Sequence, residues 1–341
     1  MKKNHRTGLK RVFTGSPFLF VVVALTFIAM RSGAVAGEAS SIAIKVGLLP
    51  PFPFYWASYV AEQKGLFKDE RLNVEIIQLS RPSEAVQALV GGSLNFAWVS
   101  ADAFINANEA GASVPIIAQA VGNPAFSVIV QPGIKSWSEV KGKTVAVSAP
   151  KDGAAILFRL MAHANGLRES DYTFISVGTT PNRYAALKSR AVDVAIMGQP
   201  QDFVAVKEGF RMLGRSDTVL KNYAFIMIGT NKAWAEGHRD EVLRYLTVLR
   251  KAVDWLHSPA NKSAAVDVLL KGMRRGERET MEKIYSIYFE EGLGKIITRG
   301  AEVDVEGLRV FGQKLKELDI LKRDPDPARW TDLSYQRAAA K

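Results

Sequence analysis

Cysteine is absent from the 341 residues of the chain, and histidine occurs only four times. The missing cysteine excludes disulfide bonds, metal sites built on thiolates and catalysis by a thiol nucleophile. It also excludes a lipid anchor of the kind that bacterial lipoproteins carry on a cysteine after their cleavage site. No histidine has a metal-binding residue four positions away, the spacing typical of a helical metal site.

The sequence motifs of common enzymes are missing too. The chain contains no Gly-x-Ser-x-Gly elbow, no phosphate loop ending in Gly-Lys-Ser/Thr and no dinucleotide-binding glycine fingerprint. We therefore expect no enzymatic activity, no metal and no cofactor.

Positive charge is concentrated at the start of the chain. A basic segment precedes an apolar run at 18–30, which is too short to span a bilayer, and Ala34-Val35-Ala36 offers a small-residue cleavage site. This pattern predicts a signal peptide at 1–36, cleaved near Ala36, and a periplasmic location. Export follows the ordinary secretory route or, through Lys10-Arg11, the twin-arginine route.

The rest of the chain is only mildly basic. Removing the six basic residues of the first 36 lowers the formal charge from +11 to +5. No run of Lys and Arg with interleaved aromatic residues marks a nucleic-acid groove. About 305 residues remain, enough for two lobes of ordinary size. We expect a soluble monomer that does not insert into a membrane after cleavage and does not bind nucleic acid.

Short apolar runs alternate with segments of helical pattern, and the alternation occurs twice. In the first occurrence we expect strands at 42–49, 72–77 and 96–99 and helices at 55–64 and 84–90. In the second we expect strands at 143–147 and 174–177 and helices at 153–165 and 183–188. Leu89–Ala97 aligns with Leu187–Ala195 without a gap. A strand at 224–228 and helices at 239–257 and 305–318 follow. The pattern predicts an α/β protein with parallel sheets, helices on both faces, and two lobes of one topology.

Five stretches, in this order, resemble the periplasmic solute-binding proteins for nitrate, aliphatic sulfonates and taurine, with their thiamine-precursor-binding relatives. They are 46–55, AEQKGLFK at 61–68 with LNVE at 72–75, ALVGGSLNFA at 88–97, VKGKTVAV at 140–147 and TNKAW at 230–234. The resemblance implies a two-lobed type II binding protein, or Venus flytrap, with two hinge crossings and a ligand cleft between the lobes. It implies one lobe from 42–121 plus 223–335 and a second lobe from 122–222.

Open α/β sheets bind ligands beyond the carboxyl ends of their strands, so the loops that follow strands hold the candidate ligand-binding residues. These are Tyr55, Trp56, Arg81, Ser100, Asp102, Asn123, Ser148, Lys151, Gly153, Ala154, Thr179 and Gln199. Tyr55 and Trp56 offer aromatic faces with a polar edge. The loop around Lys151 leads into a helix start, which favours an anion. Asp102 serves equally well as a helix cap, and Gln199 departs from the bulky or acidic pair usual in the family.

The family resemblance implies the substrate-binding component of an ABC importer, which delivers its ligand to a membrane permease and the ATPase of that permease. A small organic anion, sulfonate-like, taurine-like or carboxylate-like, is the first expectation for the ligand. A neutral heterocycle such as a thiamine precursor is the alternative within binding proteins. A ligand sensor for a membrane receptor and, less favoured, an enzyme on the same fold remain open.

Overall fold

The computed structural model describes residues 43–219, 223–290 and 296–340. The predicted signal peptide at 1–36 lies outside these residues. No helix in the described ranges is long and apolar enough to cross a membrane. The contacts of residues 41–341 form one unit, and the lobe boundaries inside it stay a prediction.

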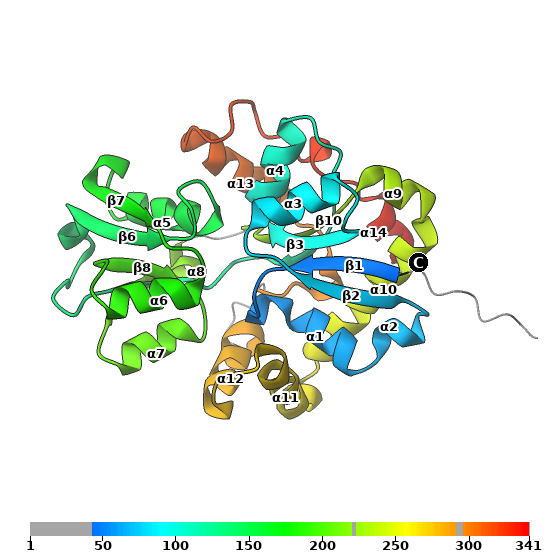
Figure 1. Ribbon diagram of the computed structural model, residues 1–341, viewed down its shortest axis with the longest axis horizontal. Coiled ribbons are helices and arrows are strands. Elements are labelled where there is room, and N and C mark those ends of the chain that lie inside the picture. Colours follow the sequence, from blue (N-terminus) through cyan, green and yellow to red (C-terminus); the bar gives the residue numbers. More distant parts are fainter. Residues whose placement is uncertain (1–42, 220–222, 291–295, 341) are drawn as a thin grey trace, which may run out of the picture. The chain divides into compact units, whose positions relative to one another are not determined.

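In the part of the chain that the structure describes, ten strands form two five-stranded sheets, whose strands are drawn as arrows in Figure 1. The first sheet has the order β2-β1-β3-β10-β4 and the second the order β7-β6-β8-β5-β9. The strands of the first sheet are β1 (Ala43–Leu48), β2 (Asn73–Gln78), β3 (Phe96–Ser100), β4 (Ile116–Val121) and β10 (Ile226–Thr230). Those of the second are β5 (Ser127–Val130), β6 (Lys143–Val147), β7 (Tyr172–Ser176), β8 (Val194–Met197) and β9 (Arg211–Arg215).

The two sheets repeat one arrangement, as the aligned stretches predicted. β1 pairs in parallel with β2 and β3, and β6 pairs in the same way with β7 and β8. The expectation of parallel sheets holds for these strands but not for the whole of each sheet, because β10 runs antiparallel between β3 and β4, and β5 runs antiparallel between β8 and β9. Both sheets are therefore mixed. In each sheet, the antiparallel strand directly follows a crossing of the chain from the other sheet.

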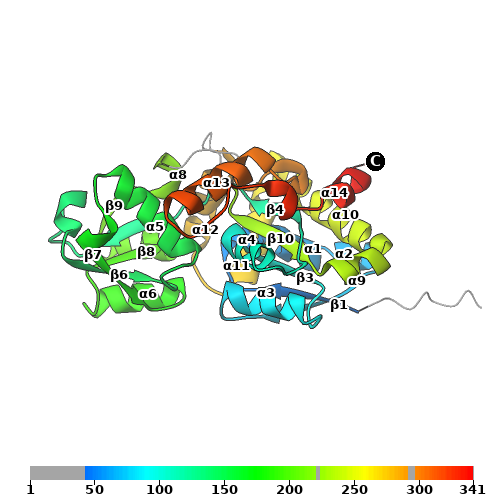
Figure 2. The same cartoon turned by 90° about the horizontal axis from the view of Figure 1, so that it is seen from above.

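Helices cover both faces of each sheet. The helices are α1 (Trp56–Gln63), α2 (Leu66–Asp69), α3 (Pro82–Val90), α4 (Ala101–Glu109), α5 (Gly153–Ala164), α6 (Thr180–Lys188), α7 (Gln201–Lys207), α8 (Ser216–Val219), α9 (Lys232–Gly237), α10 (Arg239–Leu256), α11 (Lys262–Met273), α12 (Arg278–Tyr285), α13 (Val305–Glu317) and α14 (Ser334–Ala339). The connections β6 to β7 and β7 to β8 move in opposite directions along the sheet. Right-handed crossovers therefore place α5 and α6 on opposite faces (Figure 2).

The last third of the chain packs on the first sheet. The buried residues of α10 recur at helical spacing, as in Val242, Leu246, Leu249 and Val253. Tyr245 of this helix stacks on Phe96 of β3 at a centroid distance of 4.1 Å, and Trp98 Nε1 donates to the Tyr245 hydroxyl at 2.9 Å. The C-terminal helices therefore share a core with β1–β4.

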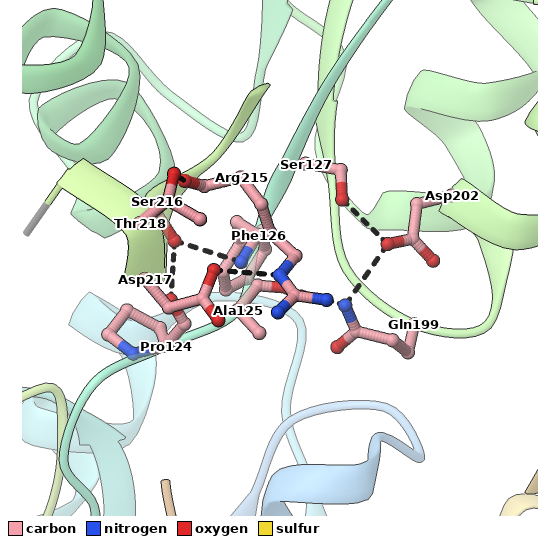
Figure 3. Close-up of polar contacts among 10 residues, drawn as sticks. All are labelled: Pro124, Ala125, Phe126, Ser127, Gln199, Asp202, Arg215, Ser216, Asp217 and Thr218. Atoms are coloured by element: carbon pink, nitrogen blue, oxygen red, sulfur yellow. Dashed lines mark hydrogen bonds and ion pairs between the residues drawn. The ribbon is translucent and has the colours of Figure 1, made fainter. Parts of the chain in front are cut away.

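Two crossing segments connect the sheets: 122–126 leads from β4 to β5, and 216–225 leads from β9 to β10. Ser216 joins them, because its amide donates to Phe126 O at 2.7 Å and its Oγ accepts from Phe126 N at 2.9 Å. Asp202 lies beside the first crossing and accepts from Ser127 Oγ at 2.7 Å and Gln199 Nε2 at 3.0 Å (Figure 3). The crossings are therefore bound to each other and to the loop that follows β8.

Candidate functional site

A cavity of about 180 Å³ lies where loops from both sheets meet. Its walls come from the segments that follow β1, β2, β3, β6 and β7, with further side chains beside the crossings. The lining residues are Leu49, Pro50, Pro51, Phe52, Phe54, Tyr55, Ser80, Arg81, Pro82, Ser100, Phe126, Ser148, Asp152, Gly153, Ala154, Gly178, Thr179, Thr180, Pro181, Arg183, Phe225, Ile226 and Arg275. The cavity thus occupies the carboxyl edge of both sheets, the usual ligand position in open α/β folds.

Four phenylalanines make an apolar wall. Phe52 lies 4.6 Å from Phe54 and 5.9 Å from Phe126, measured between ring centroids, and Phe225 lies 5.8 Å from both Phe54 and Phe126. Gly198 of the second sheet's loop lets Phe52 approach, because a methyl group there would lie 2.1 Å from Phe52 Cζ. This wall suits the planar or apolar part of a ligand.

Three helix starts face the same cavity. Pro82, Gly153 and Thr180 are the first residues of α3, α5 and α6, and all three line the cavity. The first N–H groups of a helix lack partners within that helix, and the helix dipole adds partial positive charge there. Converging helix starts favour an anionic group in this position.

Arg183 is a buried part of the cavity wall, only 3% exposed. Its Nε donates to Ile196 O at 2.7 Å, Nη2 donates to Thr180 Oγ1 at 2.8 Å, and Nη1 donates to Gly178 O. Burial lowers the pKa of its guanidinium to about 10, partly offset by attraction to Asp152, so the group is cationic at neutral pH. The side chain mainly shapes the loop before α6. By contrast, Arg81 and Arg275 are exposed where they line the cavity.

A second hollow of about 590 Å³ adjoins the cavity and shares Arg81, Pro82 and Asp152 with it. Asp102 and Lys151 line this hollow and not the cavity. Burial raises the pKa of the Asp102 carboxyl to about 7, and the neighbouring Asp152 adds to the rise. Asp102 is therefore a buried acid that is close to its ionisation point at neutral pH.

The structure brings seven of the twelve predicted residues together around the cavity: Tyr55, Arg81, Ser100, Ser148, Gly153, Ala154 and Thr179. Of these, Tyr55 contributes mainly its ring, because its hydroxyl accepts from Leu49 N at 3.3 Å and the residue is 3% exposed.

The other five predicted residues have different surroundings. Trp56 points away from the cavity into the core, where Nε1 donates to Ala265 O at 3.0 Å. Asn123 holds the crossings together by accepting from Tyr223 N at 2.7 Å. Gln199 is fully buried, and its Nε2 donates to Ala125 O at 2.5 Å and to Asp202. Asp102 and Lys151 lie at the second hollow, as described above.

Several residues that line the cavity were not among the ligand-binding residues predicted from the sequence: the four phenylalanines, Asp152, Arg183 and Arg275. Phe52 and Phe54 stand in the same loop as Tyr55, and the sequence signal for them was the proline-rich aromatic run itself. Phe126 and Phe225 lie in or beside the crossings, where no local pattern marks a ligand-facing residue.

Within the described parts of the chain, no group of three or more His, Asp or Glu side chains is arranged to hold a metal ion.

Comparison with known families and proteins gives a consistent result. The family described as NMT1/THI5 like matches residues 54–262. A Brucella abortus protein, provisionally named a binding protein, is 27% identical over 296 residues, or 83% of this chain and 87% of that protein. A 4-amino-5-hydroxymethyl-2-methylpyrimidine phosphate synthase of Saccharomyces cerevisiae is 20% identical over 222 residues, or 60% of this chain and 64% of the synthase.

Solved structures share the fold at low sequence identity. The periplasmic nitrate-binding protein of Synechocystis has a TM-score of 0.74 and 16% identity, covering 88% of this chain and 89% of its own. The alkanesulfonate-binding protein of Xanthomonas axonopodis, solved with MOPS, has a TM-score of 0.71 and 15% identity, covering 86% and 99%. The two-lobed α/β fold of periplasmic binding proteins, predicted from the sequence, is confirmed.

Proposed function

The chain belongs to the NMT1/THI5-like family, and from this premise we propose that it captures a small organic anion for an ABC importer. It acts outside the cytoplasm after removal of residues 1–36. It is a monomer, and it passes the ligand to a membrane permease with its ATPase. The solved proteins of the same fold that bind nitrate and alkanesulfonate support this role.

The convergence of three helix starts on one cavity carries the proposal. An anionic group held at the first turns of α3, α5 and α6 would gain from three helix dipoles, and the first turn of α5, which contains no proline, offers it the most N–H groups. Arg81 adds a cationic side chain at the start of α3. The cavity volume of about 180 Å³ limits the enclosed part of the ligand to a small group.

The proposed contacts divide into a polar and an apolar set. The polar set is Arg81, Ser100, Gly153, Ala154 and Thr179, which lie at helix starts, and Ser148, which directly follows β6. The apolar set is the phenylalanine wall with Tyr55, which would take the organic body of the ligand. Alkyl or aryl sulfonates and carboxylates combine both features.

A neutral nitrogen heterocycle is the second candidate. The observation in its favour is that the phenylalanine wall faces the same cavity as Asp152, whose Oδ1 has no hydrogen-bond partner among the described residues. A ring N–H could donate to that oxygen while its faces contact the phenylalanines. The yeast relative named as a pyrimidine phosphate synthase is in keeping with such a ligand. We expect binding without catalysis in either case.

A thermal-shift screen of residues 37–341 tests the function. The panel holds nitrate, alkyl and aryl sulfonates, taurine, aromatic carboxylates and pyrimidines. A ligand at 100 times its dissociation constant stabilises the native state by about 2.7 kcal/mol. We expect hits among the organic anions.

The Arg81→Gln variant decides between the two ligand classes, with Arg211→Gln on the exposed edge strand β9 as the matched control. For an anion, Arg81→Gln should weaken binding about tenfold, corresponding to about 1.4 kcal/mol, and Arg211→Gln should leave it unchanged. Hits restricted to pyrimidines, with both variants binding normally, would favour the heterocycle. A panel without hits would contradict the importer proposal.

A further inference from the structure

Two acidic side chains meet beside the cavity, one from each sheet's set of helices. Asp102 lies in the first turn of α4, which follows β3, and Asp152 directly precedes α5, which follows β6. A methyl group on Gly153 would lie 3.3 Å from Asp102 Oδ1 and 3.2 Å from Ser100 Cβ. The first turns of α4 and α5 are therefore in contact, and this contact places the Asp102 carboxyl beside the residue that follows Asp152, whose charge acts on it.

Both carboxyls are incompletely satisfied. Oδ1 of Asp102, Oδ1 of Asp152, Ser100 Oγ and Tyr223 Oη are buried and have no hydrogen-bond partner of ordinary geometry among the described residues. Asp102 is 3% exposed, as is Tyr223. Buried polar atoms without partners are unfavourable, and they are rare in native proteins. The Ser100 and Ser148 side chains lower the pKa of Asp102 and Asp152 respectively by hydrogen bonding, but Oδ1 of each carboxyl has no partner among the described residues.

The charges around the pair do not neutralise it. Within the described part of the chain, the charged group that acts on Asp102 is Asp152 itself. Arg183 attracts Asp152 from α6, but the three hydrogen bonds of its guanidinium go to Gly178 O, Thr180 Oγ1 and Ile196 O and not to the carboxyl. Lys151 and Arg81 line the adjoining hollow with exposed side chains. Tyr223, which precedes β10, faces Asp102 with a neutral hydroxyl.

We propose that Asp102 and Asp152 form a proton-binding pair, which takes one proton from solvent when the loops of the two sheets come into contact. The proton bonded to one carboxyl is donated to the free oxygen of the other, so a single hydrogen bond satisfies both orphaned atoms. Two neighbouring carboxylates in a buried site cannot both ionise without a large electrostatic penalty. When the two loops separate, each carboxyl returns to water and the proton is released.

The inference rests on the proposed function and extends it, because capture of an anion then includes uptake of a proton. Two carboxylates beside the cavity would repel the anion, and uptake of one proton halves the negative charge of the pair and so weakens that repulsion. The raised pKa of Asp102, about 7 through burial and the nearness of Asp152, sets the range in which this occurs. Burial also raises the pKa of Asp152, although the Ser148 hydroxyl and Arg183 oppose the rise.

The direction of the pH effect follows from linkage. A carboxyl with a pKa raised on contact favours the contact state at low pH, and this contribution is lost as the pH rises through about 7. The affinity for an anion should therefore increase as the pH falls from about 8 to 5, by at most about tenfold per pH unit for one proton.

The test compares the mature chain at a saturating concentration of a ligand from the panel, which holds the loops in contact, with the unliganded chain. The aspartate carboxyls are labelled with ¹³C, and their NMR shifts are followed from pH 3 to 9 in the wild type and in Asp152→Asn. We expect Asp102 of the liganded wild type to titrate near 7 and that of the liganded variant to titrate at a lower pH. Titration of both carboxyls near 4 in the liganded wild type would overturn the proposal, as would an Asp102 titration that is the same in Asp152→Asn.

Urea unfolding of Asp102→Asn, Asp152→Asn and the double variant supplies a second, independent measurement. Asn mimics the protonated carboxyl, so each single variant should raise the unfolding midpoint at pH 8 relative to its effect at pH 5. The double variant should have no higher unfolding midpoint than the single variants, because one neutral side chain already removes the repulsion between the two carboxylates. Asp69→Asn, at an exposed aspartate on α2, is the control and should show no such pH dependence.

The ligand and proton proposals fail separately. A ligand panel without hits removes the anion and leaves the urea comparison of the aspartate variants as the test of the pair. Ordinary titration of both carboxyls removes the proton pair and leaves ligand binding intact. A ligand that binds more weakly as the pH falls and loses affinity in Asp102→Asn would show that the pair holds a cationic group of the ligand, which contradicts the proton proposal.

Discussion

At the scale of single residues, the buried guanidinium of Arg183 fixes one wall of the cavity from inside. Its three donors reach Gly178 O, Thr180 Oγ1 and Ile196 O, so one side chain connects the loop before α6 to the end of β8. The planar fork of arginine holds three acceptors in fixed directions, which the single ammonium of lysine cannot do. The position of the α6 start therefore depends on this residue.

We predict that Arg183→Lys lowers both stability and ligand affinity. Two of the three main-chain and side-chain acceptors would lose a charged donor, at a cost of about 2 kcal/mol or more. Urea unfolding at pH 7 measures the loss, and the conservative Arg211→Lys on the exposed edge of β9 is the control. Equal unfolding midpoints for the two variants would show that the Arg183 fork is not needed.

At the scale of the elements, the crossings depend on a small set of buried polar side chains. Ser216 is fully buried and both accepts from Phe126 N and donates to Pro124 O, which links the second crossing to the first. Burial raises the pKa of Asp202 to about 6, while its hydrogen bonds with Ser127 and Gln199 oppose the rise. Figure 3 shows these hydrogen bonds, which connect the first crossing to the second crossing and to the loop that follows β8.

Ser216→Ala should loosen the crossings. The substitution leaves the Phe126 amide and the Pro124 carbonyl without this partner, a loss of about 1–3 kcal/mol in the free energy of unfolding. We also expect a faster release of bound ligand, because Phe126 is part of the cavity wall. Urea unfolding and stopped-flow release measure the two effects. Ser93→Ala, at an exposed serine, is the control, and an unchanged release rate would separate the crossing from ligand binding.

Elements with local signals could be predicted from the sequence, and those defined by distant partners could not. The expected helices at 153–165 and 239–257 correspond to α5 and α10, because their spacing and end signals are local. β5 gave no such signal: it pairs with β8 and β9, more than 60 residues away. A short apolar run is compatible with a strand or a buried helix, so only the assembled sheet decides its role and direction.

The candidate site, too, was predictable only in part from local sequence signals. Its loops were predictable, because the carboxyl ends of parallel strands meet at one edge. The side chains that face inward were not, since one step along the short helical turn at Pro53–Tyr55 separates Tyr55 at the cavity from Trp56 in the core. Likewise, Asp152 lines the cavity, whereas the residue before it, Lys151, lines only the second hollow.

At the scale of the whole described molecule, loops of the two sheets touch at two glycines. Phe52 packs on Gly198, and Ser100 lies against Gly153. Both contacts leave no room for a side chain on the glycine without movement, so they define one close arrangement of the loops. A ligand enclosed by both sets of loops can enter only if these contacts open.

A disulfide between positions 100 and 153 tests whether they open. A Cβ atom on Gly153 would lie 3.2 Å from Ser100 Cβ, slightly below the 3.5–4.5 Å that a disulfide prefers, so a small shift permits the bond. The chain has no cysteine of its own, and the Ser100→Cys/Gly153→Cys variant can therefore form one intramolecular disulfide. Closing a loop of roughly 50 residues should stabilise the oxidised form by about 4 kcal/mol, which a higher melting temperature would report.

The oxidised double variant should bind a ligand from the screen at least about tenfold more slowly than the same protein after reduction, because the cavity cannot admit the ligand while the loops are joined. Stopped-flow binding before and after addition of dithiothreitol measures the difference. The single variants Ser100→Cys and Gly153→Cys show what the substitutions alone do to the site. If the bond forms, as judged by the melting temperature, and binding is equally fast in both redox states, the ligand does not enter between these loops. The cavity would then be the wrong site, because Ser100 and Gly153 both line it.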